Sequence, residues 1–318
     1  MLARFIDLGA EAMQDRLRGT LIGLAVGDAL GAAVEFRPPG SFAPVVCYRS
    51  GGPHGLAPGE WTDDTSMALA LADSLAESGW DLHDQLHRYV RWWREGEYSV
   101  TGRCFDSGIA TRSALARFRQ HGDPLQSGDP DESSSGNGSI MRLAPVPIRY
   151  AGLFPASLEE LARLATESSL TTHASEQCLS ACRYLTFVLV GLQHGRDRDE
   201  VLAPDWKPLL RLNQLRPLHP SIAAVAAGSF REHSPPQITG SGWVVKSLEA
   251  ALWAFHDAKS FEEAVLRAVN LGDDADTTGA VCGQLAGAFW GESGVPQRWR
   301  DGLAGRDLIE RALQGLLS

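Results

Sequence analysis

The sequence lacks several features that mark specialised classes of protein. Its five cysteines are an odd number, widely scattered and without a CxxC pair, so neither a disulfide framework nor a zinc site is expected. No stretch reaches eighteen uncharged apolar residues, about the length that spans a membrane. The N-terminal region is interrupted by Arg4, Asp7 and Glu11 and so lacks the apolar core of a signal peptide. These absences favour a protein of the reducing cytoplasm without a membrane span.

Positive charge is also scarce. The 318 residues include 29 Lys and Arg against 39 Asp and Glu, which gives a net charge of −10. No nucleic-acid partner is therefore expected, although an acidic enzyme can still gather cations or bind a phosphate locally. With 44% hydrophobic residues the chain is ample for a sizeable core. Helical patterning resumes on both sides of every long loop, so we expect one domain over residues 1–318.

Alternating patterns typical of strands are nearly absent. The only candidate strand is "APVVCYR" at 43–49, and its pattern is weak. Apolar residues recur instead at three- and four-residue steps in the segments 15–35, 62–78, 83–95, 106–119, 157–169, 174–194, 243–257, 261–270, 277–290 and 305–317. The expected fold class is all-α. Long loops at 37–60, 120–138 and 231–242 are rich in Gly, Pro and Ser, and loops of this length are more often functional than idle.

Glycine recurs at every fourth position in two of these predicted helices. The positions are Gly19, Gly23, Gly27 and Gly31 in the first, and Gly279, Gly283 and Gly287 in the second. Each glycine weakens a helix by roughly 1 kcal/mol relative to alanine, and the natural offset is close approach of another helix backbone. A transmembrane pairing face would show the same stripe, but Asp28, Gln284 and the short lengths argue against it. We expect two central helices that pack tightly together.

Paired aspartates precede or begin two of the helices. They lie in "WTDDTSMALALADSL" at 61–75 and in "NLGDDADTTGA" at 270–280, and the first glycine helix adds Asp28 and Glu35. Helix capping can explain either cluster alone, because Thr62 can cap the first amides and acidic groups suit the positive end of a helix dipole. If the clusters meet, however, four or five carboxylates share one cleft.

Such a cleft would need cations. Two like charges about 4 Å apart repel by roughly 4 kcal/mol at an effective dielectric constant near 20. The carboxylates would therefore hold protons or separate unless cations neutralised them. Carboxylate and hydroxyl oxygens are hard ligands that suit Mg²⁺, Mn²⁺ or Ca²⁺ rather than zinc, and no EF-hand spacing is present. The pattern favours a metal site for divalent cations.

Six segments stand out along the chain: "GLAVGDALGAAVEF", "GEWTDDTSMALALADSL", "SGNGSIMRLAPVPI", "LTTHAS", "SGWVVKSLEAALWAF" and "NLGDDADTTGAVCGQLAGAFWG". Together they resemble the successive motifs of the ADP-ribosylglycohydrolase family, especially its bacterial dinitrogen-reductase-activating branch. They follow the family's order from about residue 16 to residue 291, which is most of the chain. The resemblance implies a compact single-domain orthogonal bundle of helices around a central cleft with two Mg²⁺ or Mn²⁺ ions.

The resemblance also assigns the acidic residues. The metal ligands that it implies are Thr62, Asp63, Asp64, Asp274, Asp276 and Thr277. Asp276 falls at the position that bridges both ions, and Glu35 at the acid that approaches the metal or the attacking water. Asp28 and Asp273 receive no such role, and Asp28 is a candidate to cap or brace the cleft.

Substrate residues are expected mainly in "SSSGNGSIMR" at 133–142. A flexible turn is the alternative, but glycines permit unusual backbone angles and successive amides can cradle a phosphate. The resemblance places this loop against the diphosphate and ribose of ADP-ribose, with the residues Ser135, Gly136, Asn137, Gly138 and Ser139. It places His173 beside the phosphate or ribose, although a lone histidine is often structural. It puts "GRCFDSG" near the ribose, and Trp243 where a tyrosine is usual, so that its ring could stack on the adenine or frame the cleft. We expect Cys104 to pack rather than to act as a nucleophile.

The implied function is removal of ADP-ribose from protein side chains by hydrolysis at C1″. An arginine linkage is favoured because a guanidinium leaving group would meet the acidic rim, and Asp63, Asp64 or Glu35 could act as acid or base. Three alternatives stay open: a silent ADP-ribose-binding or toxin-neutralising protein, a hydrolase of serine-linked ADP-ribose, and a metal-dependent phosphohydrolase. The expected partners are an ADP-ribosylated protein and ADP-ribose.

Overall fold

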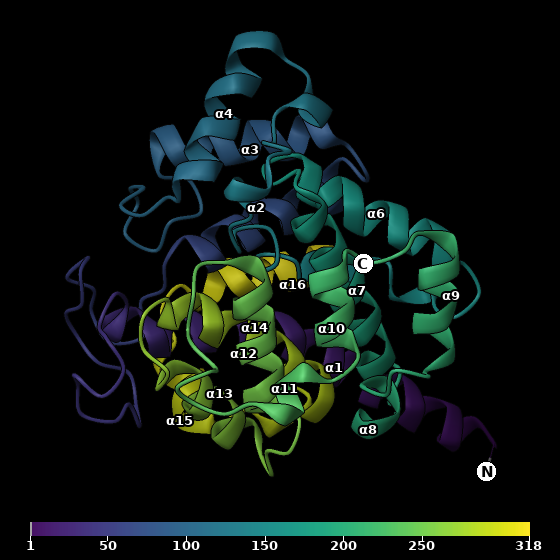
Figure 1. Cartoon of the computed structure of the whole chain (residues 1–318). Helices are drawn as coiled ribbons and strands as arrows, with labels where there is room; N and C mark the ends of the chain where they lie inside the picture. Colours follow the sequence, from purple (N-terminus) through teal and green to yellow (C-terminus); the bar gives the residue numbers. More distant parts are fainter. Residues whose placement is uncertain (1) are drawn as a thin grey trace.

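The computed structural model describes residues 2–318, with side chains from Gly9 onward, and is built from helices (Figure 1). The α-helices are α1 (Leu2–Gly31), α2 (Asp63–Glu77), α3 (Leu82–Glu95), α4 (Ile109–His121), α5 (Pro145–Arg149), α6 (Leu158–Leu170), α7 (Glu176–Gln193), α8 (Arg198–Val201), α9 (Lys207–Leu215), α10 (Pro220–Ala226), α11 (Ser229–Glu232), α12 (Val244–Phe255), α13 (Phe261–Val269), α14 (Ala275–Trp290), α15 (Gln297–Gly302) and α16 (Arg306–Leu317). The predicted all-α class is confirmed.

The weak candidate strand at 43–49 is not a strand in the structure. Residues 2–318 contain isolated bridges but no β-strand. The Asn270 side chain accepts a hydrogen bond from the N–H of Val45 (2.7 Å) and donates one to its carbonyl (3.0 Å). A side-chain amide thus occupies the backbone groups that a neighbouring strand would have used, and the segment remains a loop.

Each of the ten expected helices is present, with shifted ends. The first begins at Leu2 rather than residue 15 and ends at Gly31, followed by a 3₁₀ turn over Ala32–Val34. The fourth begins at Ile109, which leaves Asp106 in the preceding loop. Six helices that the periodicity did not predict are short, between four and nine residues: α5, α8, α9, α10, α11 and α15. A helix of one or two turns is too short to show a clear apolar period.

Helices α1 and α14 form the tightly packed central pair that the glycine stripes predicted. They run antiparallel, so that Gly19 faces Gly287, Gly23 faces Gly283 and Gly27 faces Gly279. A Cβ atom added to Gly23 would overlap the carbonyl oxygen of Gly283. In Figure 1 the purple α1 passes through the middle of the molecule, where α14, α2 and α13 pack against it.

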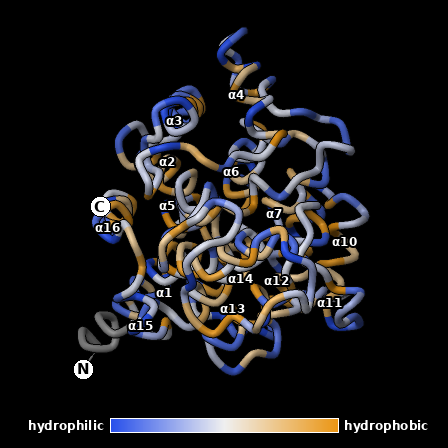
Figure 2. The backbone as a smooth tube through the Cα atoms, turned by 90° about the vertical axis from the view of Figure 1, so that its left-hand side faces the viewer, coloured by the Kyte–Doolittle hydropathy of each residue, from blue (hydrophilic) through white to orange (hydrophobic). Residues whose placement is uncertain are grey.

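The hydrophobic core surrounds this pair. It draws on buried residues from Leu17 near one end to Leu316 near the other. Figure 2 shows apolar segments gathered in the interior and hydrophilic ones on the periphery, including much of α3 and α4. One helix, Gly9–Val34, is long and apolar enough to cross a bilayer, but 83% of its apolar window is buried inside the protein, as in a core helix.

Candidate metal centre and ligand cavity

Asp28 of α1 caps helix α2. Its Oδ1 accepts hydrogen bonds from the N–H (2.8 Å) and hydroxyl (2.9 Å) of Thr62, and its Oδ2 from the N–H (3.0 Å) and hydroxyl (2.6 Å) of Thr65. The alternative that the Thr62 side chain caps the helix does not hold, because its hydroxyl makes no cap hydrogen bond. Burial raises the pKa of Asp28 to about 6, against the lowering effect of the hydrogen bonds. Asp28 is therefore a brace between α1 and α2.

Helices α2 and α14 bring their acidic residues together. Thr62 Oγ1 lies 3.2 Å from Oδ2 of Asp64 and 3.1 Å from Oδ2 of Asp276. Carboxylate oxygens of Asp28, Asp64 and Asp276 lie within 4.8 Å of one another. Oδ1 of Asp64 and Oδ1 of Asp276 are buried and have no hydrogen-bond partner. A buried carboxylate oxygen without a partner is costly, and a cation is the group that would satisfy it.

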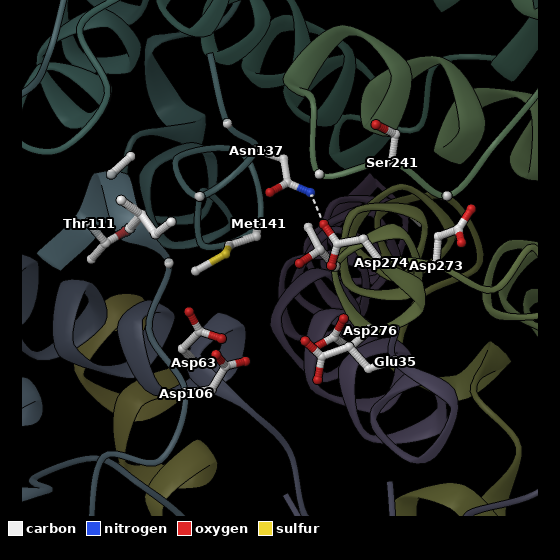
Figure 3. A pocket seen from close by; sticks show the side chains of 18 of the residues that line it. Glu35, Asp63, Asp106, Thr111, Asn137, Met141, Ser241, Asp273, Asp274 and Asp276 are labelled. Atoms are coloured by element: carbon white, nitrogen blue, oxygen red, sulfur yellow. Dashed lines mark hydrogen bonds between the residues drawn. The ribbon is translucent and has the colours of Figure 1, made fainter. Parts of the chain in front are cut away.

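A second acidic group adjoins the first. Carboxylate oxygens of Glu35, Asp274 and Asp276 also lie within 4.8 Å of one another, so Asp276 belongs to both groups. Asp274 Oδ2 accepts a hydrogen bond of 2.7 Å from Asn137 Nδ2, which is the dashed line in Figure 3. Thr277 Oγ1 lies 3.5 Å from Asp64 Oδ2. The clusters from opposite ends of the chain thus converge, as the cleft hypothesis required.

The electrostatics of the centre point to cations. Burial raises the pKa of Asp63, Asp64 and Asp276 well above the usual range, and neighbouring carboxylates raise it further. Burial, and then the charges of Asp106 and Asp274, raise the pKa of Glu35 to about 10. With its orphaned oxygens and hard oxygen donors, the centre fits Mg²⁺ or Mn²⁺.

A cavity of about 740 Å³ opens over the acidic groups (Figure 3). Its acidic lining consists of Glu35, Asp63, Asp106, Asp273, Asp274 and Asp276. The lining on its other sides includes residues 136–138, His173 and residues 239–242. Two of the three long loops thus line the cavity. The third, 37–60, supplies His54, whose Nε2 lies 3.0 Å from Glu35 Oε2 and 3.4 Å from Asp106 Oδ2.

The structure places the predicted substrate residues in two groups. Four of them line the cavity: Gly136, Asn137, Gly138 and His173. Ser135 and Ser139 are buried outside the lining, where their hydroxyls contact Ser175, the N-cap of helix α7, and Cys182 within that helix. Trp243 is 40% exposed beside the loop and also lies outside the lining. The two serines therefore attach the loop to α7.

Several residues around the cavity were not singled out from the sequence. Asp106 lies inside "GRCFDSG", where only Cys104 had been considered, and His54 lies in a loop marked as functional by its length alone. Burial raises the pKa of the Cys104 thiol to about 11, which agrees with a packing role. Phe36 and Ile109 line the cavity with exposed side chains, and no sequence pattern marked them.

The fold and the site together define an all-helical protein in which two acidic groups sharing one aspartate lie beside a glycine-lined cavity. The model of the ADP-ribosylglycohydrolase family matches residues 10–318. The chain belongs to the ADP-ribosylglycohydrolase family, which confirms the predicted family and enzyme class.

Named relatives cover nearly the whole chain. It is 43% identical to an ADP-ribosylarginine hydrolase Tri1 of Pseudomonas putida (strain GB-1), over 99% of this chain and 81% of that protein. It is 31% identical to an ADP-ribosyl-[dinitrogen reductase] glycohydrolase of Rhodospirillum rubrum, over 91% and 90%. A solved structure described as an ADP-ribosylglycohydrolase-related protein complex superposes with a TM-score of 0.83 at 43% identity, covering 96% of this chain and 98% of that one.

Proposed function

We propose that this protein hydrolyses the N-glycosidic bond between ADP-ribose and an arginine side chain of a protein, with two Mg²⁺ or Mn²⁺ ions. The observation that carries the proposal is the pair of acidic groups that share Asp276 beside a cavity of about 740 Å³. The names of the relatives support the linkage, since two of those more than 35% identical are ADP-ribosylarginine hydrolases. The five free cysteines fit a reducing cytoplasm as its place of action.

The residues proposed to hold the ions are those implied by the resemblance: Thr62, Asp63, Asp64, Asp274, Asp276 and Thr277. The unpartnered oxygens of Asp64 and Asp276 support this assignment. Bound ions would supply Lewis acidity to hydroxyl groups or water beside them. The glycine loop and His173 would bind the ADP-ribose on the other side of the cavity.

Asp63 is the proposed general base. Its carboxylate lines the cavity and has no hydrogen-bond partner within residues 9–318, whereas Asp64 is fully buried and lies outside the lining. Glu35 is the alternative, because it also lines the cavity, but His54 already binds its carboxylate. In the reaction the water oxygen forms a bond to C1″. The bond between C1″ and the guanidino nitrogen breaks, and its electron pair stays on the nitrogen. Asp63 accepts the water proton, which the departing guanidine then takes up.

The charge of the cavity favours arginine over serine as the leaving residue. Asp106 and Asp273 place carboxylates on the cavity wall, and a guanidinium group there would be attracted by them. A serine hydroxyl gains nothing from these charges. The proposal therefore predicts a preference for arginine-linked ADP-ribose.

The test uses two labelled proteins, one with arginine-linked and one with serine-linked ADP-ribose, each incubated with the enzyme and either Mg²⁺ or EDTA. We expect free ADP-ribose from the arginine-linked protein and only in Mg²⁺. Release from the serine-linked protein instead would reassign the linkage. AMP or inorganic phosphate as product would indicate a phosphohydrolase, and binding of ADP-ribose without release would indicate a silent binding protein.

A further inference from the structure

If the ligand is ADP-ribose, its diphosphate must bind without a lysine or arginine side chain in the cavity wall. None of the described residues that line it is lysine or arginine, and six are carboxylic acids. The donors beside the glycine loop are therefore neutral. Within residues 2–318, the backbone N–H groups of Gly138 and Ser139 have no hydrogen-bond partner, and His173 is the histidine of the lining.

The His173 ring is fixed on one side and open on the other. Its Nδ1 lies 2.9 Å from Thr172 Oγ1, and its side chain is only 3% exposed. Its Nε2 has no hydrogen-bond partner within residues 2–318 and lies against the glycine loop, 3.0 Å from where a Cβ on Gly138 would stand. Nε2 is thus a polar atom in a nearly buried side chain that lines the cavity.

Arg142 decides which nitrogen of His173 carries the proton. Its Nη2 donates to Thr172 Oγ1 at 2.8 Å, and a guanidinium group can only donate. Thr172 is fully buried, and His173 Nδ1 is its only other hydroxyl partner within residues 2–318. If Nδ1 also carried a proton, the hydroxyl proton of Thr172 would be left without an acceptor, which is unfavourable at a buried site. The arrangement therefore favours a bare Nδ1 and a protonated Nε2.

Among the side chains that the structure describes, no carboxylate is a partner of Arg142. It is fully buried, and its guanidinium donates to the Tyr89 hydroxyl (2.8 Å), the Ser168 carbonyl (3.2 Å) and the Thr171 hydroxyl (3.2 Å) besides Thr172. It also lies over the Tyr89 ring, 4.7 Å from the centroid. Burying a cation without an anion costs free energy. A function toward an anionic ligand in the adjacent cavity would explain why Arg142 is buried there.

We propose that Arg142 and Thr172 are positioning residues that hold His173 as the Nε2–H tautomer, so that it donates a hydrogen bond to a diphosphate oxygen of the ligand. The identity of the ligand rests on the proposed function, whereas the tautomer does not. Burial, and then the charge of Arg142, lower the pKa of His173 to about 3, so the ring stays neutral at physiological pH. The donor is therefore a neutral imidazole. Its tautomer is fixed through Thr172 by Arg142, a residue that does not line the cavity.

The first measurement is the tautomer in the ligand-free protein. Nitrogen-15 NMR of the histidine-labelled chain distinguishes protonated from bare ring nitrogens, and a His173→Gln variant identifies the signals of this ring among the nine histidines. We expect a bare Nδ1 and a protonated Nε2. A protonated Nδ1 would overturn the inference, whatever the protein binds.

The second measurement is the affinity for ADP-ribose by calorimetry in Mg²⁺. Thr172→Val leaves Nδ1 without its donor and frees the ring, so we expect affinity to fall about tenfold, as for loss of one hydrogen bond to a charged group. Thr172→Ser should restore it. Thr171→Val is the matched control, because Thr171 accepts from Arg142 without touching His173, and its affinity should match the wild type.

Equal affinities in Thr172→Val and Thr171→Val would contradict the claim that Thr172 links Arg142 to the His173 ring. These variants keep Arg142, whose own replacement could prevent folding. A wild-type protein that does not bind ADP-ribose would contradict the proposed function alone. The roles of Arg142 and Thr172 would still be tested by the NMR measurement of the His173 tautomer.

Discussion

Asp276 is the side chain on which the two acidic groups depend. It belongs to both groups and has one buried oxygen without a partner. Asp276 lies in the first turn of α14, and its Oδ2 accepts a hydrogen bond from the Thr62 hydroxyl rather than from a backbone N–H of the helix. Its role can therefore be separated from the fold.

We expect Asp276→Ala to lower Mg²⁺-dependent release of ADP-ribose by at least about 100-fold, as for loss of a shared metal ligand. Far-UV circular dichroism should show unchanged helical content. Asp205→Ala, at an exposed aspartate before α9, is the control and should keep full activity. Full activity in Asp276→Ala would refute the ligand assignment.

His173 makes stability depend on pH. Its pKa falls from 6.5 to about 3 on folding, so between these values the unfolded chain binds a proton that the folded chain does not. The free energy of unfolding therefore falls as pH falls through this window, by up to about 1.4 kcal/mol per pH unit from this group. His173→Gln removes the contribution, and its urea midpoint should fall less between pH 6.5 and pH 5. Parallel decreases in the two proteins would show that His173 is protonated in the folded state.

Helices α1 and α14 set the geometry of the site. Their glycine contacts fix the distance between backbones, and Asp28 then ties the start of α2 to α1 through Thr62 and Thr65. The acidic residues at the starts of α2 and α14 are consequently held by the same packing.

We expect Gly23→Ala to reduce the free energy of unfolding by about 1–3 kcal/mol or more, because the new methyl group overlaps the carbonyl of Gly283. Gly9→Ala is the matched control in the same helix, since a Cβ there meets nothing within 4 Å. It should leave stability unchanged or raise it by up to about 1 kcal/mol. Thermal unfolding measures both, and equal stability of the two variants would contradict the close packing.

The element scale also shows where sequence reasoning stopped. The glycine period predicted the α1–α14 contact, because a four-residue repeat of small residues has few other uses in a helix. A local rule offered Thr62 as a possible cap of α2, yet the cap is Asp28, 34 residues before Thr62 in the chain. Local rules cannot find a cap that comes from another helix.

The whole molecule carries a net charge of −10 and concentrates six acidic side chains around one cavity. Without cations, close carboxylates there repel one another by roughly 4 kcal/mol per pair at 4 Å and a dielectric constant near 20. Ligands that bind only the folded state stabilise it, by about 2.7 kcal/mol at one hundred times their Kd. Metal binding and stability should thus be coupled.

We expect Mg²⁺ or Mn²⁺ to raise the melting temperature of the EDTA-treated protein, and KCl at equal ionic strength to raise it far less. Asp64→Asn removes one buried carboxylate, so its metal-free form should be more stable than the metal-free wild type and should gain less from Mg²⁺. Differential scanning calorimetry measures the melting temperatures of both proteins after EDTA treatment and after addition of Mg²⁺, Mn²⁺ or KCl. Identical responses to Mg²⁺ and KCl would argue against a cation site.

The sequence by itself determined the helical class, the central helix pair and the two acidic clusters, because apolar period, glycine spacing and adjacent aspartates are local patterns with direct physical meaning. Tertiary structure alone decided that His54 joins Glu35 and Asp106, that Ser135 and Ser139 face α7, and that Arg142 reaches His173 through Thr172. These are contacts between side chains of different segments, and their partners are set by how the helices pack rather than by neighbours in the chain.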